Sequence, residues 1–74
     1  MEQQKKSLAE YMRLLGWNQS KLCQKAGINS RTAKKAMEGE EIMPGVAENI
    51  AIAISYALGE RVLPGEIEGL KIIK

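Results

Sequence analysis

Hydrophobic residues recur along this chain at intervals of three and four, which is the spacing that places side chains on one face of an α-helix. Leu8, Met12 and Leu15 follow this spacing, and no stretch alternates apolar and polar residues as a half-buried strand would. We therefore expect an all-α fold of about five short helices without a β-sheet.

Capping residues and glycines divide this pattern into segments. Ser7 followed by Glu10 has the composition of a capping box at the start of a helix, and a glycine commonly ends one. The expected starts are at Ser7, Asn18, Asn29 and Pro44, and the expected ends are at Gly16, Gly27, Gly39 and Gly59. Residues 40–43 are expected to form a polar loop, and one more helical turn is expected near residues 62–67. The domain is thus predicted at 7–69, between a flexible tail at 1–6 and an apolar tail at 70–74.

The segment 44–58 is the most apolar part of the chain, and its apolar residues cover more of the helix than one core-facing stripe requires. Leu70, Ile72 and Ile73 extend this apolar surface beyond the last turn. A patch of this kind is an aggregation risk unless a second copy covers it. We expect a homodimer that associates through this helix and the C-terminal tail; the alternative is that so small a core needs all of these side chains.

The composition excludes several classes of protein. The chain has 74 residues, no His and a single cysteine, Cys23, so it lacks the usual nucleophile–base pairs, most zinc sites and any internal disulfide. We expect no enzyme activity, no catalytic residue, no metal site and no cofactor. The longest apolar run, 50–54, is far shorter than the roughly 20 residues that span a bilayer, and no signal peptide is apparent. A cytoplasmic location without membrane contact is therefore expected.

The charges are divided unevenly between the two halves of the chain. Residues 1–37 hold eight basic and two acidic residues, a net charge of +6, whereas residues 38–74 hold three basic and seven acidic residues, a net charge of −4. Such a distribution can produce one strongly basic face, which is typical of nucleic-acid-binding proteins. The alternative is a set of solvated helix faces without a binding role.

The segment 19–39 has the spacing of a helix-turn-helix motif. This motif needs a small residue where the two helices touch, a glycine in the turn, and apolar residues at fixed offsets in the second helix. Counting Gln19 as position one, Cys23 is at position five, Gly27 at nine, Ala33 at fifteen and Ala36 at eighteen. The second helix would carry its basic residues outward, which suits it to the major groove of DNA.

On these residues the chain resembles the phage repressor and Cro-type helix-turn-helix proteins, also called the xenobiotic-response-element family. The stretch from Gly16 to Gly27, GWNQSKLCQKAG, is similar to that family's "GLNQAELAQKVG" type of segment. Met37-Glu38-Gly39 and Ala57-Leu58-Gly59 resemble the ends of its third and fourth helices. The similarity extends over residues 8–67 and implies a lambda-repressor-like helix-turn-helix domain.

Three positions or segments depart from the family pattern. Ala33 stands where the family prefers Ile or Val, and Cys23 where it prefers Ala. The segment from Pro44 to Gly59 is about one helical turn longer than in the shorter phage members. This last departure concerns the dimer geometry and leaves the DNA-binding motif unchanged.

The resemblance implies specific DNA contacts. Gln19 matches a position that contacts a backbone phosphate and braces the recognition helix. Exposed recognition-helix positions correspond to Ser30, Arg31, Lys34 and Lys35, and Arg31 is the strongest candidate for a bidentate contact to guanine. Asn29 could contact DNA or serve only as an N-cap. Lys21, like Lys5, Lys6 and Lys25, could contact phosphate or simply be solvated.

The sequence thus favours a sequence-specific transcriptional regulator that binds double-stranded DNA, such as a small phage-, plasmid- or prophage-type repressor. The family implies a bacterial or phage-encoded protein located at the nucleoid. The alternative function is a protein-interaction module or an antitoxin that uses the same fold. Steep salt dependence of binding would distinguish a DNA-binding protein from an apolar docking module.

Overall fold

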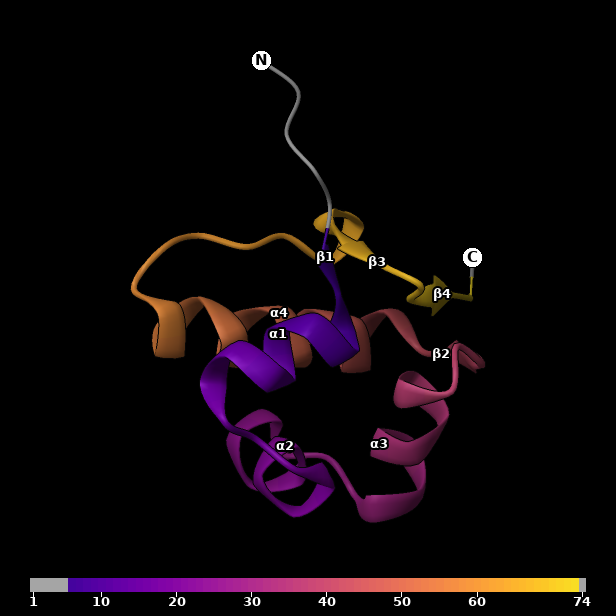
Figure 1. Cartoon of the computed structure of the whole chain (residues 1–74). Helices are drawn as coiled ribbons and strands as arrows, with labels where there is room; N and C mark the ends of the chain where they lie inside the picture. Colours follow the sequence, from indigo (N-terminus) through magenta and orange to yellow (C-terminus); the bar gives the residue numbers. More distant parts are fainter. Residues whose placement is uncertain (1–5, 74) are drawn as a thin grey trace.

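Four α-helices make up most of the part of the chain that the computed structural model describes, residues 6–73 (Figure 1). They are α1 (Leu8–Leu15), α2 (Gln19–Ala26), α3 (Ser30–Met37) and α4 (Pro44–Leu58). A single 3₁₀ turn, η1 (Pro64–Glu66), follows α4. Within these residues there are also four two-residue strands, β1 (Lys6–Ser7), β2 (Glu41–Ile42), β3 (Ile67–Glu68) and β4 (Lys71–Ile72). The protein is therefore a small, mostly helical domain.

Side-chain caps and glycines set the helix boundaries. At the start of α1 the backbone N–H of Glu10 donates to Ser7 Oγ at 3.2 Å, and the Ser7 backbone N–H donates to the Glu10 carboxylate at 3.5 Å. This pair is the predicted capping box, and it satisfies backbone groups that the first turn of a helix leaves without partners. Gly16 ends α1 with a φ of 70°, in the left-handed region that glycine adopts without strain. Both predicted ends of α1 are confirmed.

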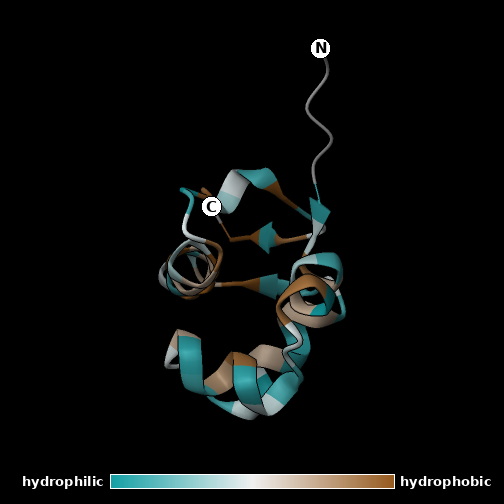
Figure 2. Cartoon of the chain, turned by 60° about the vertical axis from the view of Figure 1, so that its left-hand side comes forward, coloured by the Kyte–Doolittle hydropathy of each residue, from teal (hydrophilic) through white to brown (hydrophobic). Residues whose placement is uncertain are grey.

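The most apolar helix, α4, crosses the middle of the molecule. In Figure 1, α2 and α3 lie on one side of it, while η1, β3 and β4 lie on the other. The largest fully buried side chains are Leu22 of α2 and Ile50 and Ile54 of α4, and α2 packs closely against α4. Figure 2 shows that α2 and α3, at the bottom of the view, are largely hydrophilic. The core therefore lies along α4, and the polar outer surface lies on α2 and α3.

The short strands correct the expectation that the chain has no sheet. They form two parallel pairs: β1 with β3, where Lys6 faces Ile67, and β2 with β4, where Glu41 faces Lys71. Strands of two residues are too short to produce an alternating pattern in the sequence, and their partners are far apart in the chain. The expected polar loop at 40–43 therefore contains a strand, in which Ile42 is buried.

Residues 70–73 pack against the rest of the domain and do not form a separate apolar tail, and Lys74 of the predicted tail at 70–74 lies outside the described residues. Residues Lys71–Ile72 form β4, and the Ile73 N–H donates to the carbonyl oxygen of Ile42 at 2.9 Å. Leu70 and Ile72 pack against the core, so only Ile73 among the apolar residues here is well exposed. The reason is that backbone pairing with β2 holds this segment against the fold. At the other end, Lys6 belongs to β1, while residues 1–5 of the predicted tail lie outside the described residues.

Candidate nucleic-acid interface

Two consecutive eight-residue helices, α2 and α3, are joined by a tight turn at Gly27. The Gly27 N–H donates to the carbonyl oxygen of Cys23 at 2.9 Å, and the N–H of Ile28 donates to the same oxygen at 3.1 Å. Gly27 has a φ of 68°, which favours glycine because a side chain would crowd the backbone there. Cys23 is a free, half-buried thiol beside this turn. The turn thus brings α3 back against α2 within three residues.

Each of these two helices begins at an asparagine cap, as the sequence predicts. The Lys21 N–H donates to Asn18 Oδ1 at 2.9 Å at the start of α2. The Thr32 N–H donates to Asn29 Oδ1 at 2.7 Å at the start of α3. An N-cap of this kind accounts for the first turn of a short helix that contains few apolar residues. The oxygen of Asn29 is therefore engaged in capping, and its amide nitrogen is the group that could face a ligand.

A side-chain contact connects the beginnings of the two helices. Gln19, the first residue of α2, is half buried, and its Nε2 donates to Ser30 Oγ at 2.9 Å and to the Ser30 carbonyl oxygen at 3.2 Å. Because Ser30 is the first residue of α3, these two hydrogen bonds fix where α3 starts relative to α2. The structure therefore places Gln19, Ser30 and the neighbouring cap residue Asn29 together.

Helix α3 has one small apolar face and one basic face. Ala33 and Ala36 are buried, and their small side chains allow α3 to lie close to α2 and the core. Arg31, Lys34 and Lys35 are exposed, and their spacing of three and four residues aligns them on the side of the helix opposite the two alanines. Three cations thus form a row along the solvent side of α3.

The positive charge of this region is not offset within the two helices. No Asp or Glu occurs between Glu10 and Glu38, and Lys21 and Lys25 are exposed on α2 in addition to the three cations on α3. Acidic residues begin at the end of α3, where Glu38, Glu40 and Glu41 are exposed. The basic surface therefore has an acidic border on the side where α3 ends.

The remaining candidate residues lie apart from this surface or outside the described residues. Lys6 is in β1, and Figure 1 shows β1 on the opposite side of α1 from α2 and α3. Lys5 lies outside the described residues. The structure brings Gln19, Asn29 and Ser30 together, and the candidate interface adds to them the exposed cations of α2 and α3, which are Lys21, Lys25, Arg31, Lys34 and Lys35.

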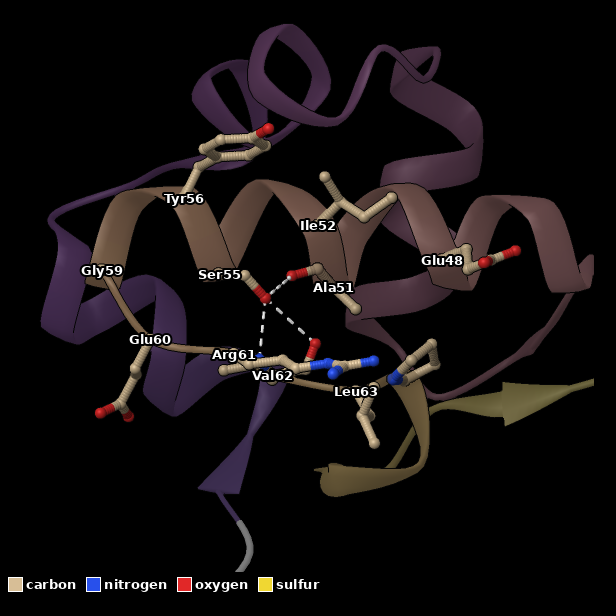
Figure 3. A pocket seen from close by; sticks show the side chains of 11 residues that line it. Glu48, Ala51, Ile52, Ser55, Tyr56, Gly59, Glu60, Arg61, Val62 and Leu63 are labelled. Carbon is tan, nitrogen blue, oxygen red and sulfur yellow. Dashed lines mark hydrogen bonds between the residues drawn. The ribbon is translucent and has the colours of Figure 1, made fainter.

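The surface also has a hollow that the sequence does not predict. It lies between α4 and residues 59–64, where Ile52 and Tyr56 are exposed (Figure 3). The excess of apolar residues around α4 was a signal of it. The loop residues that form its other wall could not be assigned from periodicity.

Among residues 6–73, no group of three or more His, Cys, Asp or Glu side chains could hold a metal ion. The pKa of Tyr11 is raised above its usual 10.0, first by burial in the core and then by the nearby carboxylates of Glu66, Glu60 and Glu10. Tyr11 lies in α1 and belongs to the core, not to the basic surface.

None of the helices in the described part of the chain is both long and apolar enough to cross a bilayer. A comparison of the chain with known protein families, with characterised proteins and with solved structures finds no match.

Proposed function

We propose that the chain is a sequence-specific DNA-binding transcriptional regulator with a lambda-repressor-like helix-turn-helix domain. The observation that carries this proposal is the row of Arg31, Lys34 and Lys35 on the solvent side of α3, on a helix fixed at its start by Gln19. A helix with this character can enter the major groove, where its outward side chains face the base edges. The closest functional type is a small phage-, plasmid- or prophage-type repressor.

Base recognition is assigned to the exposed side of α3. Arg31 has the planar guanidinium group that forms two hydrogen bonds with guanine, and it lies one residue after the start of the helix. Ser30 presents a hydroxyl group beside it, and Lys34 and Lys35 follow one turn later. Arg31 is therefore the residue on which sequence preference depends most.

Phosphate contacts are assigned to the N-terminal end of α2 and its lysines. The first turn of a helix attracts anions because its backbone N–H groups point outward. Gln19 and Lys21 both lie in the first turn of α2, and Asn29 stands beside Gln19 through the contact of Gln19 with Ser30. These contacts would orient α3 on the duplex and contribute affinity without sequence preference.

The alternative function is a protein-interaction module or an antitoxin, and the exposed apolar groove beside α4 is the feature that favours it. The two functions predict different responses to salt. A protein that neutralises about five phosphates loses affinity with a log–log slope of about −4 to −5 in salt concentration. Binding through an apolar groove changes little with salt.

A selection from random DNA duplexes at controlled salt, followed by titration of the selected duplex at several salt concentrations, tests the proposal. We expect one preferred sequence and the steep slope given above. Lys6→Ala is a matched control because it removes one positive charge from the other side of α1, and it should leave the affinity nearly unchanged. Absence of any enriched sequence together with a flat salt response would contradict the proposal.

A further inference from the structure

Helix α3, which carries the candidate base-contacting residues, has little apolar anchorage of its own. Its two buried residues are Ala33 and Ala36, and the larger Met37 at its last position is 42% exposed. An alanine side chain removes only one methyl group from water, so these two residues allow a close approach to the core but contribute little to holding the helix there. The position of α3 therefore depends on what its two ends are attached to.

The start of α3 is attached to α2. Gln19 Nε2 donates to Ser30 Oγ at 2.9 Å and to the Ser30 carbonyl oxygen at 3.2 Å. Among the described residues, no side-chain hydrogen bond joins residues 34–38 to another part of the chain. The end of α3 must therefore be held through the backbone that follows it.

That backbone is paired with the C-terminal segment. Strand β2 comes shortly after α3 and pairs in parallel with β4, where Ile42 faces Ile72. The Ile73 N–H donates to the carbonyl oxygen of Ile42 at 2.9 Å. The turn between α3 and β2 lies against the same segment, because a Cβ atom added to Gly39 would be 3.7 Å from the carbonyl oxygen of Gly69. The C-terminal segment thus contacts both the turn after α3 and the strand beyond it.

The other end of this segment is held at the start of α1. Strand β3 pairs with β1, where Lys6 faces Ile67, and β1 ends at Ser7, the N-cap of α1. The Ile67 side chain is buried, and Leu70 packs against the core. Figure 1 shows β3 beside β1 and β4 near β2. We call residues 67–73 the strap, because they connect the start of α1 with the end of α3.

We propose that the strap fixes the C-terminal end of α3 and thereby positions this helix for DNA recognition, and that Ile72 is the positioning residue through which it acts. Ile72 lies opposite the buried Ile42 and packs against the core, so its side chain keeps β4 paired with β2. Ile72 is not part of the basic surface and acts only through α3. This role rests on the proposed DNA-binding function, because it concerns how the same surface is oriented.

The placement of α3 should affect base contacts more than phosphate contacts. A bidentate contact from Arg31 to guanine requires the side chain to be held within about 0.5 Å of its productive position. A lysine on phosphate acts as a point charge on a flexible stem and tolerates larger displacements. With its end released, α3 would tilt about its fixed start, and the direction of its outward row of cations would vary. Loss of the strap contact should therefore reduce sequence preference more than general affinity for DNA.

Ile72→Ala tests this role in the full-length chain, and Val62→Ala is the matched control. Val62 is also an apolar residue in contact with the core, but it lies in the loop after α4, which Figure 1 shows far from α3. Circular dichroism identifies a temperature at which both variants are folded, and DNA titrations are made there. We expect Ile72→Ala to bind the selected duplex at least about tenfold more weakly and random duplex less than about twofold more weakly. Val62→Ala should change neither affinity, and Ile72→Val should restore both.

Amide hydrogen exchange tests the same attachment without DNA. The Glu38 N–H donates to the carbonyl oxygen of Lys34 at 2.9 Å, so its exchange rate reports on the end of α3. After correction for the difference in global stability, this group should exchange at least about tenfold faster in Ile72→Ala than in Val62→Ala. The Ala33 N–H, near the fixed start of α3, should exchange at the same corrected rate in both variants.

The two readouts distinguish failure of the strap from failure of the proposed function. Equal corrected exchange of the Glu38 N–H in the two variants would overturn the inference. An unchanged affinity of Ile72→Ala for the selected duplex, or equal losses on the selected and random duplexes, would overturn it as well. Faster exchange at Glu38 in a chain that prefers no DNA sequence would uphold the strap as the element that fixes α3 and would contradict the proposed DNA-binding function.

Discussion

The α2–α3 pair and α4 are stabilised in different ways. Each helix of the pair has only eight residues, follows a capping asparagine and exposes cations, two on α2 and three on α3. By contrast, α4 has fifteen residues, starts at Pro44 after Met43, which makes no side-chain capping bond, and buries Ile50 and Ile54 completely. Short polar helices depend on caps and turns, whereas a long apolar helix depends on burial. Substitutions of the same type should therefore have different effects in the two regions.

The two regions also present different surfaces to solvent. The α3 surface carries Arg31, Lys34 and Lys35, and the α4 surface carries Ile52 and Tyr56. A polyanion suits the first of these, and an apolar partner suits the second. The two surfaces of this 74-residue chain therefore suit partners of different chemistry.

The largest expected effect is in the buried side of α4. Ile54→Ala removes a fully buried side chain and leaves a cavity, which should lower the free energy of unfolding by about 2–5 kcal/mol. The matched control is Ile52→Ala on the same helix, where half of the side chain is exposed, and it should cost less than about 1 kcal/mol. Urea unfolding of dilute protein measures both values. Equal losses would contradict the assignment of the two faces of α4.

The next effect concerns the turn of the α2–α3 pair. Gly27→Ala places a side chain at a φ of 68°, and the free energy of unfolding should fall by about 1–2 kcal/mol although space is available there. Gly45→Ala in the first turn of α4 should instead raise stability by about 0.5–1 kcal/mol, because alanine favours the helix. Thermal unfolding compares the two variants, and a stabilising Gly27→Ala would show that this turn has another conformation.

A smaller effect is expected at the caps. Asn29→Ala removes the acceptor of the Thr32 N–H and should lower the free energy of unfolding by about 1 kcal/mol. The control is Asn49→Ala. Asn49 is exposed within α4, so this change should alter the free energy of unfolding by no more than about 0.5 kcal/mol. Chemical denaturation resolves this difference. If Asn29→Ala were neutral, the start of α3 would depend on the Gln19–Ser30 contact instead.

The last effect involves Tyr11, which should make the free energy of unfolding depend on pH only under alkaline conditions. Because the folded state raises its pKa above 10.0, the unfolded chain loses the phenol proton first as the pH rises. The stabilisation that Tyr11 contributes to the folded state is therefore complete below about pH 10, and it is lost as the pH rises toward the pKa of the folded state. The difference in unfolding free energy between the unchanged chain and Tyr11→Phe should change over that window and stay constant below it. A constant difference throughout would contradict the burial of this phenol.

The helices could be predicted well from the sequence because their signals are local. Ser7, Asn18 and Asn29 act within three residues of themselves, and glycines such as Gly16 end helices through their own backbone conformation. The strands could not be predicted, because pairing joins segments such as 41–42 and 71–72 that lie far apart in the chain. The same contact explains why the C-terminal segment is not a free tail.

The outward placement of the candidate DNA-contacting residues on α3 also follows from helical periodicity. Arg31 lies opposite the buried Ala33, and Lys34 lies opposite the buried Ala36. The contact between Gln19 and Ser30 does not follow from periodicity, because it depends on the angle between two helices. The groove beside α4 depends on the course of loop 59–64, which Ser55 fixes through tertiary hydrogen bonds. Features that depend on packing between segments were therefore beyond sequence reasoning.

The central claim is that the basic face of α3 recognises a DNA sequence. The most direct test measures the DNA affinity of Arg31→Ala and of Lys21→Ala, each on the selected duplex and on random duplex at one salt concentration. Arg31→Ala should weaken the free energy of binding to the selected duplex by about 1–3 kcal/mol and relax the preference at one base position. It should change the affinity for random DNA little. Lys21→Ala should weaken binding to both duplexes about equally, as loss of a phosphate contact does. Equal losses of Arg31→Ala on both duplexes would contradict the claim.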